Sequence, residues 1–249
     1  MLADPDGAVS SIVERYWALR WEGDVDLLSS LLPTFSINLT WEVGSGREAT
    51  EGRAVVTGVP TRRFDVHLRG TGSVIGVKLH PCIGAAVCGV RASALTDRTL
   101  AAAEILPARV VDGFVEAVHL PTQEQVDALD GALAPLVPVR IPAGCETAQE
   151  ALRRAHDPEV VRVEHLARAT GLHVRTLQRM FDTHVGLQPR AVIARLRLHD
   201  AVEALDAGTD ESIAALAHRL GFFDQAHFTR EFTRAVGETP SRYAHSTRS

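Results

Sequence analysis

Apolar and polar residues alternate strictly between residues 34 and 43, where the apolar positions are Phe35, Ile37, Leu39, Trp41 and Val43. This period of two predicts a half-buried β-strand that ends at the glycine-rich segment 44–46. The same alternation recurs over 63–69 and, more loosely, over 73–79. Short strands separated by glycines predict a small antiparallel β-barrel or sandwich in the first part of the chain.

The pattern becomes helical after Pro107. Thr122 and Gln125 have the spacing of a capping box, so we expect two helices between about 108 and 136. A segment rich in helix-breaking residues follows, with Pro135, Pro138, Pro142 and Gly144. Such a segment is typical of a linker.

We therefore predict a boundary near residue 144, which divides the chain into domains 1–145 and 146–249. A second capping-box spacing, Thr147 with Glu150, opens the second domain. Short helical patterns broken by glycine and proline continue to the end of the chain, so this domain is predicted to be all-α. The overall expectation is an α+β protein of two domains.

An internal repeat with an offset of about 50 residues runs through the helical part. The first copy contains Val163, Leu166, Ala167, Gly171, Leu177, Arg179, Phe181, Gly186 and Pro189. The matched residues of the second copy are Ile213, Leu216, Ala217, Gly221, Phe228, Arg230, Phe232, Gly237 and Pro240. Each copy has the pattern of a helix-turn-helix, so we predict one motif over about 160–186 and another over about 210–237.

The residue types at the matched positions suit two helices that cross at a steep angle. Such helices approach closely at a small residue, here Ala167 or Ala217. The turn between them favours a glycine with positive φ, here Gly171 or Gly221. The leucines and phenylalanines of the repeat would then form the core between the helices. The alternative is a pair of helical hairpins that pack only for stability.

A long helix is predicted between the two copies, because Pro189 is a typical first helical residue and Gly208 a typical residue just past the end. Its apolar stripe consists of Ile193, Leu196, Ala201 and Leu205. Such a helix would hold two DNA-reading motifs about one duplex turn apart, about 34 Å.

The composition is that of a globular protein, since 45% of the 249 residues are hydrophobic and 23% are charged. No uncharged apolar run approaches about 18 residues, and the N-terminus carries Asp4 and Asp6 in place of a basic segment, so we expect neither a membrane span nor an export signal. Three cysteines without C-x-x-C spacing exclude a disulfide framework and favour a reducing cytoplasm.

Charge differs between the two parts of the chain. Residues 1–149 carry a net charge of −6, whereas residues 150–249 carry +1 together with eight of the eleven histidines. Every basic side chain except Lys78 is an arginine. An Arg- and His-rich second part is compatible with binding to nucleic acid.

The second copy closely resembles the signature of the AraC/XylS family of bacterial transcription regulators over 213–217, 221–232 and the residues Gly237, Pro240 and Tyr243. Residues 175–181 of the first copy also match, and the resemblance covers about 160–244. It implies a DNA-binding domain of two helix-turn-helix motifs joined by a connecting helix. The implied function is that of a sequence-specific regulator, an activator of transcription, that binds double-stranded DNA in the cytoplasm, at the nucleoid.

Two residues of the first copy depart from the family pattern. His173 and Val174 stand where a Ser-Pro type of helix start is common. We therefore expect a weaker cap on that helix.

Segments 13–17 and 95–98 are similar to an uncharacterised sensor-like domain found ahead of this module. The family implies a cupin-like β-barrel there, which binds a small-molecule effector or forms a homodimer. RNA polymerase is a further partner of such regulators. The sequence contains no recognisable effector motif, and no cofactor is expected.

Arg179 and Arg230 occupy matched positions in the two expected recognition helices, and a guanidinium can contact guanine through two hydrogen bonds. Residues three or four positions away share the same helical face. We therefore predict base contacts by Arg175, Gln178, Arg179, Gln225, Thr229 and Arg230. The alternatives are a solvated surface, or surface ion pairs with Asp182 or Glu231.

Six further residues are candidate DNA contacts. Thr176 and His227 are candidates for the groove, although His227 could equally pack beside its helix. The candidate phosphate contacts, which add affinity without reading sequence, are Arg190, Arg195, Arg197 and Arg242.

A metal site is the other chemistry that the first half suggests, because His67, His80 and Cys82 are ligand types for zinc or copper. Cys88 and His119 are only loosely placed as additional ligands. Buried thiols inside the barrel are the preferred interpretation, so we predict neither a metal site nor a catalytic site. The competing functions are a cupin-type metalloprotein or enzyme with a helical appendage, and a protein-interaction or assembly module.

Overall fold

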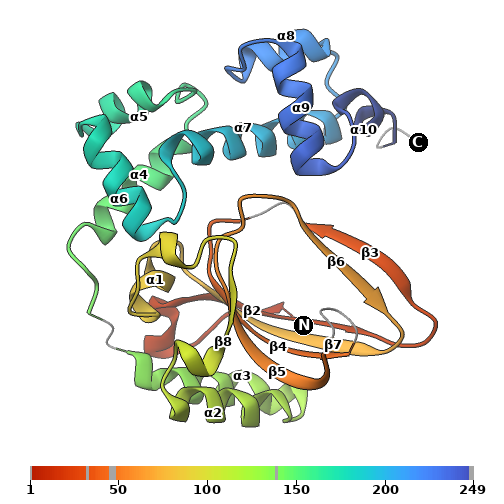
Figure 1. Cartoon of the computed structure of the whole chain (residues 1–249), viewed down its shortest axis with the longest axis vertical. Coiled ribbons are helices and arrows are strands. Elements are labelled where there is room, and N and C mark those ends of the chain that lie inside the picture. The colour runs from red at the N-terminus through yellow and green to blue at the C-terminus, as the bar shows by residue number, and fades with distance from the viewer. Residues whose placement is uncertain (1, 32–33, 45–48, 138–139, 247–249) are drawn as a thin grey trace.

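The fold is described from a computed structural model, which covers residues 2–31, 34–44, 49–137 and 140–246. Six antiparallel strands form a sheet in the order β1-β2-β7-β4-β5-β8 (Figure 1). Their bounds are β1 Leu2–Ala3, β2 Val13–Trp21, β4 Asn38–Gly44, β5 Ala49–Thr57, β7 Gly72–Leu79 and β8 Thr99–Ala101. The remaining strands, β3 Asp26–Leu31 and β6 Phe64–Arg69, form a separate two-stranded ribbon.

The prediction of a cupin-like barrel is not confirmed, because the sheet is not closed in the described part of the chain. β1 and β8 lie at the two edges of the sheet and do not pair with each other. β3 and β6 hydrogen-bond to one another, so their ribbon does not bridge those edges. A barrel requires every strand to have two neighbours, and this sheet therefore stays open. The strand expected to start at residue 34 begins at Asn38.

The alternating pattern explains which face of the sheet is buried. The register of the four central strands aligns Tyr16, Val77, Leu39 and Val56 in one row, and each is at most 2% exposed. Helices α2 Ala108–Val118 and α3 Thr122–Leu133 confirm the two helices expected between 108 and 136. The Tyr16 hydroxyl donates a hydrogen bond to Asp130 of α3 (2.6 Å), so α3 packs on this face.

Several short helices complete the first half of the chain. They are η1 Gly7–Ser11, α1 Ile83–Val87, η2 Ala92–Ala94, η3 Ala102–Glu104 and η4 Ala134–Leu136. Both expected capping boxes are wrong, because the N-cap residue of α3 is Pro121 and that of α4 is Gly144, with φ +93°. Thr122 and Thr147 therefore lie inside their helices.

The second part of the chain is all-α, as the sequence predicts. Its helices are α4 Cys145–Ala155, α5 Val163–Thr170, α6 Val174–His184, α7 Pro189–Asp206, α8 Ile213–Arg219, α9 Gln225–Val236 and α10 Pro240–Ser246. Figure 1 shows α7 running between the α5–α6 pair and the α8–α9 pair. Across the part of the chain that the structure describes, no helix is long and apolar enough to cross a membrane.

The buried core does not divide at the predicted boundary. One cluster of buried apolar residues extends from the sheet through α4, α5 and α6 to Leu196 in α7. A second cluster joins the end of α7 to α8, α9 and α10. Polar contacts reinforce the first junction: the Thr96 hydroxyl donates to the Gly186 carbonyl (2.6 Å), and the Gln149 amide donates to the Pro81 carbonyl (3.3 Å). The first helix-turn-helix is thus packed onto the sheet domain.

Candidate nucleic-acid interface

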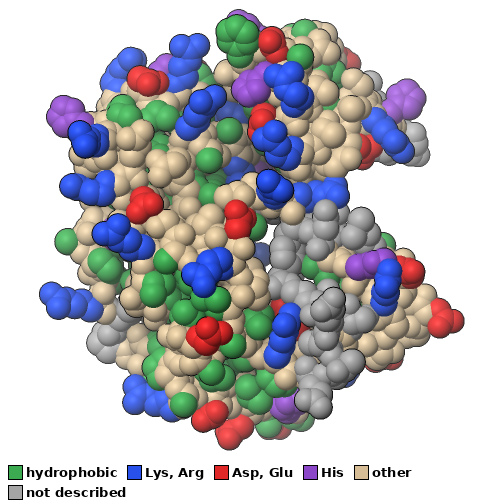
Figure 2. Space-filling view, viewed as in Figure 1, with side chains coloured by type: hydrophobic (Ala, Val, Ile, Leu, Met, Phe, Trp, Pro, Cys, Tyr) green, Lys and Arg blue, Asp and Glu red, His purple; other side chains and the backbone are tan. Residues whose placement is uncertain are grey.

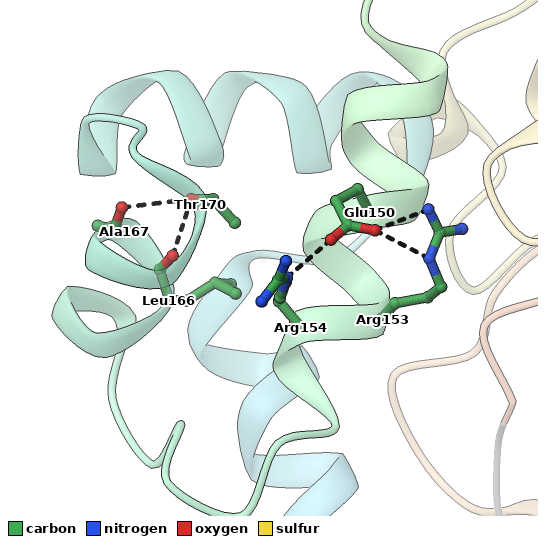
Figure 3. Close-up of polar contacts among 6 residues, drawn as sticks. All are labelled: Glu150, Arg153, Arg154, Leu166, Ala167 and Thr170. Atoms are coloured by element: carbon green, nitrogen blue, oxygen red, sulfur yellow. Dashed lines mark hydrogen bonds and ion pairs between the residues drawn. The ribbon is translucent and has the colours of Figure 1, made fainter.

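Each half of the repeat folds into two helices joined by a glycine turn, as predicted. Gly171 and Gly221 have φ values of +67° and +77°, which L-residues with a side chain rarely adopt. The core between the helices consists of side chains that are 0% exposed: Leu166, Leu177, Phe181, Leu216, Phe228 and Phe232. In the first motif the Thr170 hydroxyl donates to the carbonyls of Leu166 (2.8 Å) and Ala167 (3.3 Å), which closes the end of α5 (Figure 3).

The helix starts differ between the two motifs. Asp224 caps α9 by accepting a hydrogen bond from the backbone N–H of His227 (2.6 Å), and Ser212 caps α8 through Ala215 (3.1 Å). His173 caps α6 without a side-chain hydrogen bond, as expected from its departure from the family pattern. The second motif therefore has better satisfied N-termini.

The helix α4 that precedes the first motif carries a small ion-pair network (Figure 3). Glu150 accepts hydrogen bonds from Arg154 (2.7 Å) and from Arg153 (2.7 and 3.0 Å). These bonds, that of Arg154 above all, hold the pKa of Glu150 below its ordinary value. All three side chains are solvent-accessible, so the network orders the surface of α4 and adds little stability.

The predicted contact residues of α6 lie on its solvent face. Arg175, Gln178 and Arg179 are exposed, whereas the neighbouring residues Leu177 and Met180 are buried. Thr176 is half-buried. The structure thus brings the three long polar side chains together on one exposed helical surface.

α9 presents a matching surface. Gln225 and Arg230 are exposed and Thr229 is half-buried, while Phe228 faces the core. The His227 ring packs edge-on against Phe222, with ring centroids 5.6 Å apart, so the packing role considered for this histidine is the one observed.

The ion pairs considered as alternatives are not formed. Asp182 lies 3.8 Å from Arg91, and Glu231 pairs with Arg234 at 3.0 Å. Neither Arg179 nor Arg230 forms an ion pair with another described residue. Both guanidiniums are therefore free to reach an external ligand.

Two of the candidate phosphate contacts are wrong in this conformation. Arg195 is 9% exposed and donates hydrogen bonds to the carbonyls of Thr34 (3.1 Å) and Pro60 (2.5 Å). Arg197 is 2% exposed and bonds to the Ala155 carbonyl (2.9 Å) and Asp200 (3.0 Å). Both side chains face protein because α7 is packed on more than one side, and no phosphate can reach them.

Arg195 instead joins α7 to the sheet domain. Its guanidinium lies over the Phe35 ring, 5.3 Å from the centroid. Burial lowers the pKa of Arg195 to about 10, and the charge of Asp97 partly offsets this effect. No pattern in the sequence predicts this contact, because an arginine on a helix is most often solvated.

Arg190 and Arg242 remain exposed. Arg242 lies 3.5 Å from Glu238 in a surface ion pair. Figure 2 shows Lys and Arg side chains spread over the helical half of this view, above the sheet domain.

The sequence pattern also does not predict a second contact between the two halves of the chain. The Arg63 guanidinium donates to the Val236 carbonyl at the end of α9 (2.8 Å). The next residue, Gly237, has φ +99°, and an added Cβ there would lie 1.5 Å from Arg63. The Gly-x-x-Pro element of the repeat was the available signal, since it marked Gly237 as a position with a backbone requirement.

The histidines and cysteines of the first half that were considered as metal ligands have other contacts or are buried. His80 bonds to the Ser10 carbonyl (3.0 Å) and His67 to the Asp26 carboxylate. His119 packs edge-on against Trp41. Cys82 and Cys88 are buried, and burial raises the pKa of each thiol to about 12. Within the described ranges, three His, Cys, Asp or Glu side chains nowhere gather into a metal-binding group.

Comparisons with known proteins find matches in two separate parts of the chain. Residues 166–246 match a family model described as a helix-turn-helix domain, and residues 2–101 match one described as a domain of unknown function, DUF6597. The transcriptional activator RhaS of Pectobacterium carotovorum is 38% identical over 80 residues, which are 32% of this chain and 28% of that protein. RhaS of an Enterobacter species is 40% identical over 85 residues, 34% of this chain and 30% of that protein.

The chain thus spans less than a third of the length of these curated relatives. Among solved structures, an AraC-type regulator from Chromobacterium violaceum is 25% identical, with a TM-score of 0.38, over 43% of this chain and 96% of that one. ToxT from Vibrio cholerae is 13% identical, with a TM-score of 0.42, over 94% of this chain and 97% of that one. Residues 166–246 thus match a helix-turn-helix domain and are similar to the RhaS activators, in agreement with the resemblance of this segment to the AraC/XylS family.

Proposed function

We propose that this protein is a sequence-specific transcription regulator that binds double-stranded DNA through the major groove, and not an enzyme. The observation that carries the proposal is the pair of matched helix-turn-helix motifs whose recognition helices both expose long polar side chains. The six base contacts assigned to Arg175, Gln178, Arg179, Gln225, Thr229 and Arg230 are part of this proposal.

The connecting helix supports a two-groove arrangement. α7 has 18 residues, which corresponds to about 27 Å at 1.5 Å per residue. We expect α7 to hold the two recognition helices at a spacing near one duplex turn, about 34 Å. Each recognition helix would enter one of two successive major grooves on the same side of the duplex.

Contacts to phosphates would supply affinity without reading sequence. Arg190 and Arg242 are the exposed arginines that we assign to this role, and Thr176 contributes at the edge of the first recognition helix. His227 stays a supporting residue because its ring packs on Phe222.

The sheet domain is the proposed site of regulation. Because the first helix-turn-helix shares its buried core with the sheet, a small-molecule effector that changed the packing of the sheet would also change that motif. Homodimerisation through the same domain and contact with RNA polymerase complete the proposal. The RhaS relatives are named activators, which supports activation of transcription at the nucleoid of a bacterial cytoplasm.

The test is binding-site selection on random duplexes, followed by electrophoretic shifts over a salt titration. Arg179→Ala is expected to cost about 1–3 kcal/mol on the preferred site and to relax preference at one or two base pairs, because a bidentate base contact is lost. Arg168→Ala is the matched control, since Arg168 is exposed on α5 outside the recognition face. A protein that selects no sequence contradicts the proposal. An unchanged sequence preference for Arg179→Ala contradicts the recognition face assigned to α6.

A further inference from the structure

A cavity of about 630 Å³ lies between the two helix-turn-helix motifs. Its walls come from the start of α5 (161–164), from α7 and from the α8–α9 turn (220–223). In Figure 1, α5 and α8 stand on the same side of α7, which forms the floor between them. The volume falls within the range of small-molecule sites, about 300–1,000 Å³.

Most of the cavity lining is apolar. Val161, Ile193, Leu220 and Phe222 contribute side chains to it, and Phe223 lies at its edge with 91% of its surface exposed. An aromatic ring left in water loses the free energy that its burial would provide. An apolar body bound in the cavity would recover part of it.

Two buried nitrogen atoms of the lining lack a hydrogen-bond partner. They are Nε of Arg197 and Nδ1 of His227. The other nitrogens of the Arg197 guanidinium are held by Ala155 and Asp200, so the orientation of Nε is fixed. Both atoms are buried in protein and closed to the cavity, so the cations that can meet a ligand there are the exposed Arg162 and Arg190.

The charge of the lining favours an anion. Arg162 and Arg190 contribute positive charge against a single glutamate, Glu164, among the described lining residues, while the charge of Arg197 is paired with Asp200. Arg162 and Arg190 are exposed, and neither is ion-paired with a described residue. A guanidinium binds a carboxylate through two parallel hydrogen bonds.

We propose that this cavity binds a small organic acid, whose carboxylate is held by Arg162 and Arg190 and whose apolar body packs against the lining. A phosphate of the DNA backbone shares the anionic chemistry, but it would leave the apolar lining uncovered. An added Cβ on Gly221 would lie 2.5 Å from Val161, so the two motifs touch beside the cavity. A ligand bound between them would set their separation. This coupling to DNA rests on the proposed function, whereas ligand binding does not.

The test uses isothermal titration calorimetry of the full chain with 3-phenylpropionate, and with 3-phenylpropanol as the matched neutral probe. We expect the acid to bind at least about tenfold more tightly than the alcohol, because the neutral alcohol cannot accept charge-assisted hydrogen bonds from the guanidiniums. Arg162→Ala and Arg190→Ala should each weaken the acid by at least about fivefold by the same reasoning. Ala194→Phe, which places a ring in the cavity, should abolish binding, and Arg168→Ala is the control that should bind as the parent does.

Backbone amide shifts in NMR spectra would locate the probe at 161–164 and 220–223. Equal binding of acid and alcohol, no binding of either, or equal weakening by Arg168→Ala would overturn the proposal. So would variants at Arg162 and Arg190 that flatten the salt dependence of DNA binding without changing probe affinity, since the arginines would then serve the DNA backbone. Both variants change exposed side chains, so loss of folding is not expected to obscure the result. None of these calorimetric outcomes bears on whether the protein binds DNA.

Discussion

Replacing Arg195 with alanine should destabilise the whole protein, because this side chain joins α7 to the sheet domain. Arg195 is 9% exposed, and its guanidinium donates to the carbonyls of Thr34 and Pro60 and lies over the Phe35 ring. The substitution removes all three contacts and leaves two carbonyl groups short of a partner. It would not remove a DNA contact.

The size of the effect follows from these contacts. Hydrogen bonds from a charged donor contribute about 1.5–3 kcal/mol each, and a cation–π contact adds about 1 kcal/mol. Removing the guanidinium also removes the cost of burying its charge, which offsets part of this sum. We expect a net loss of about 2–4 kcal/mol in the free energy of unfolding.

The assay is urea denaturation, with hydrogen exchange at 34–37 and 58–63 to locate the loosened contact. Arg195→Met keeps the aliphatic stem and should separate packing from hydrogen bonding. Arg190→Ala, an exposed arginine on the same helix, should change the free energy of unfolding by no more than about 0.5 kcal/mol. If Arg195→Ala is as stable as Arg190→Ala, the proposed clamp does not exist.

DNA binding offers a second test of the same reasoning. The salt slope of the Arg195→Ala variant should equal that of the parent, since Arg195 touches no phosphate in this conformation. A salt slope flatter by about one unit would show that Arg195 contacts a phosphate and would refute the buried role.

Four further predictions concern a turn, a helix cap and the buried thiols. Gly237→Ala should lower the free energy of unfolding by about 1–3 kcal/mol, because φ +99° is strained for alanine and the added Cβ meets Arg63; a neutral result in urea denaturation would show that the turn relaxes. Asp224→Ala should cost about 0.5–2 kcal/mol by removing the α9 cap, whereas Asp210→Ala, with no cap to lose, should not. Cys82 and Cys88 should resist iodoacetamide in the native protein at pH 8 and react after unfolding, and mass spectrometry would report early labelling if burial were incomplete. Their raised pKa values also mean that unfolded thiols ionise from about pH 9 while folded ones stay neutral to about 12, so stability should fall as pH rises through that window.

The sequence alone determined the local architecture of the helical half. Close approach of two helices requires alanine at the contact, and a positive φ requires glycine at the turn, so Ala217, Gly171 and Gly221 identify the motifs without a structure. The 3.6-residue period likewise placed Arg175, Gln178 and Arg179 on one face. Both requirements act within a few residues, which is why a repeated pattern reveals them.

Only the tertiary structure decided which sides of an element meet another part of the chain. Alternation predicts a strand but not its neighbours, so the open sheet and the separate β3–β6 ribbon could not be told from a closed barrel. The sequence does not show which side of α7 packs against the rest of the protein, so its arginines are expected to be solvated. Arg195 and Arg197, which are buried, were assigned to DNA for that reason. The same holds for Arg63 and Val236, which are 173 residues apart. Contacts between distant segments depend on how whole elements pack, and hydrophobic period and turn chemistry contain no information about that packing.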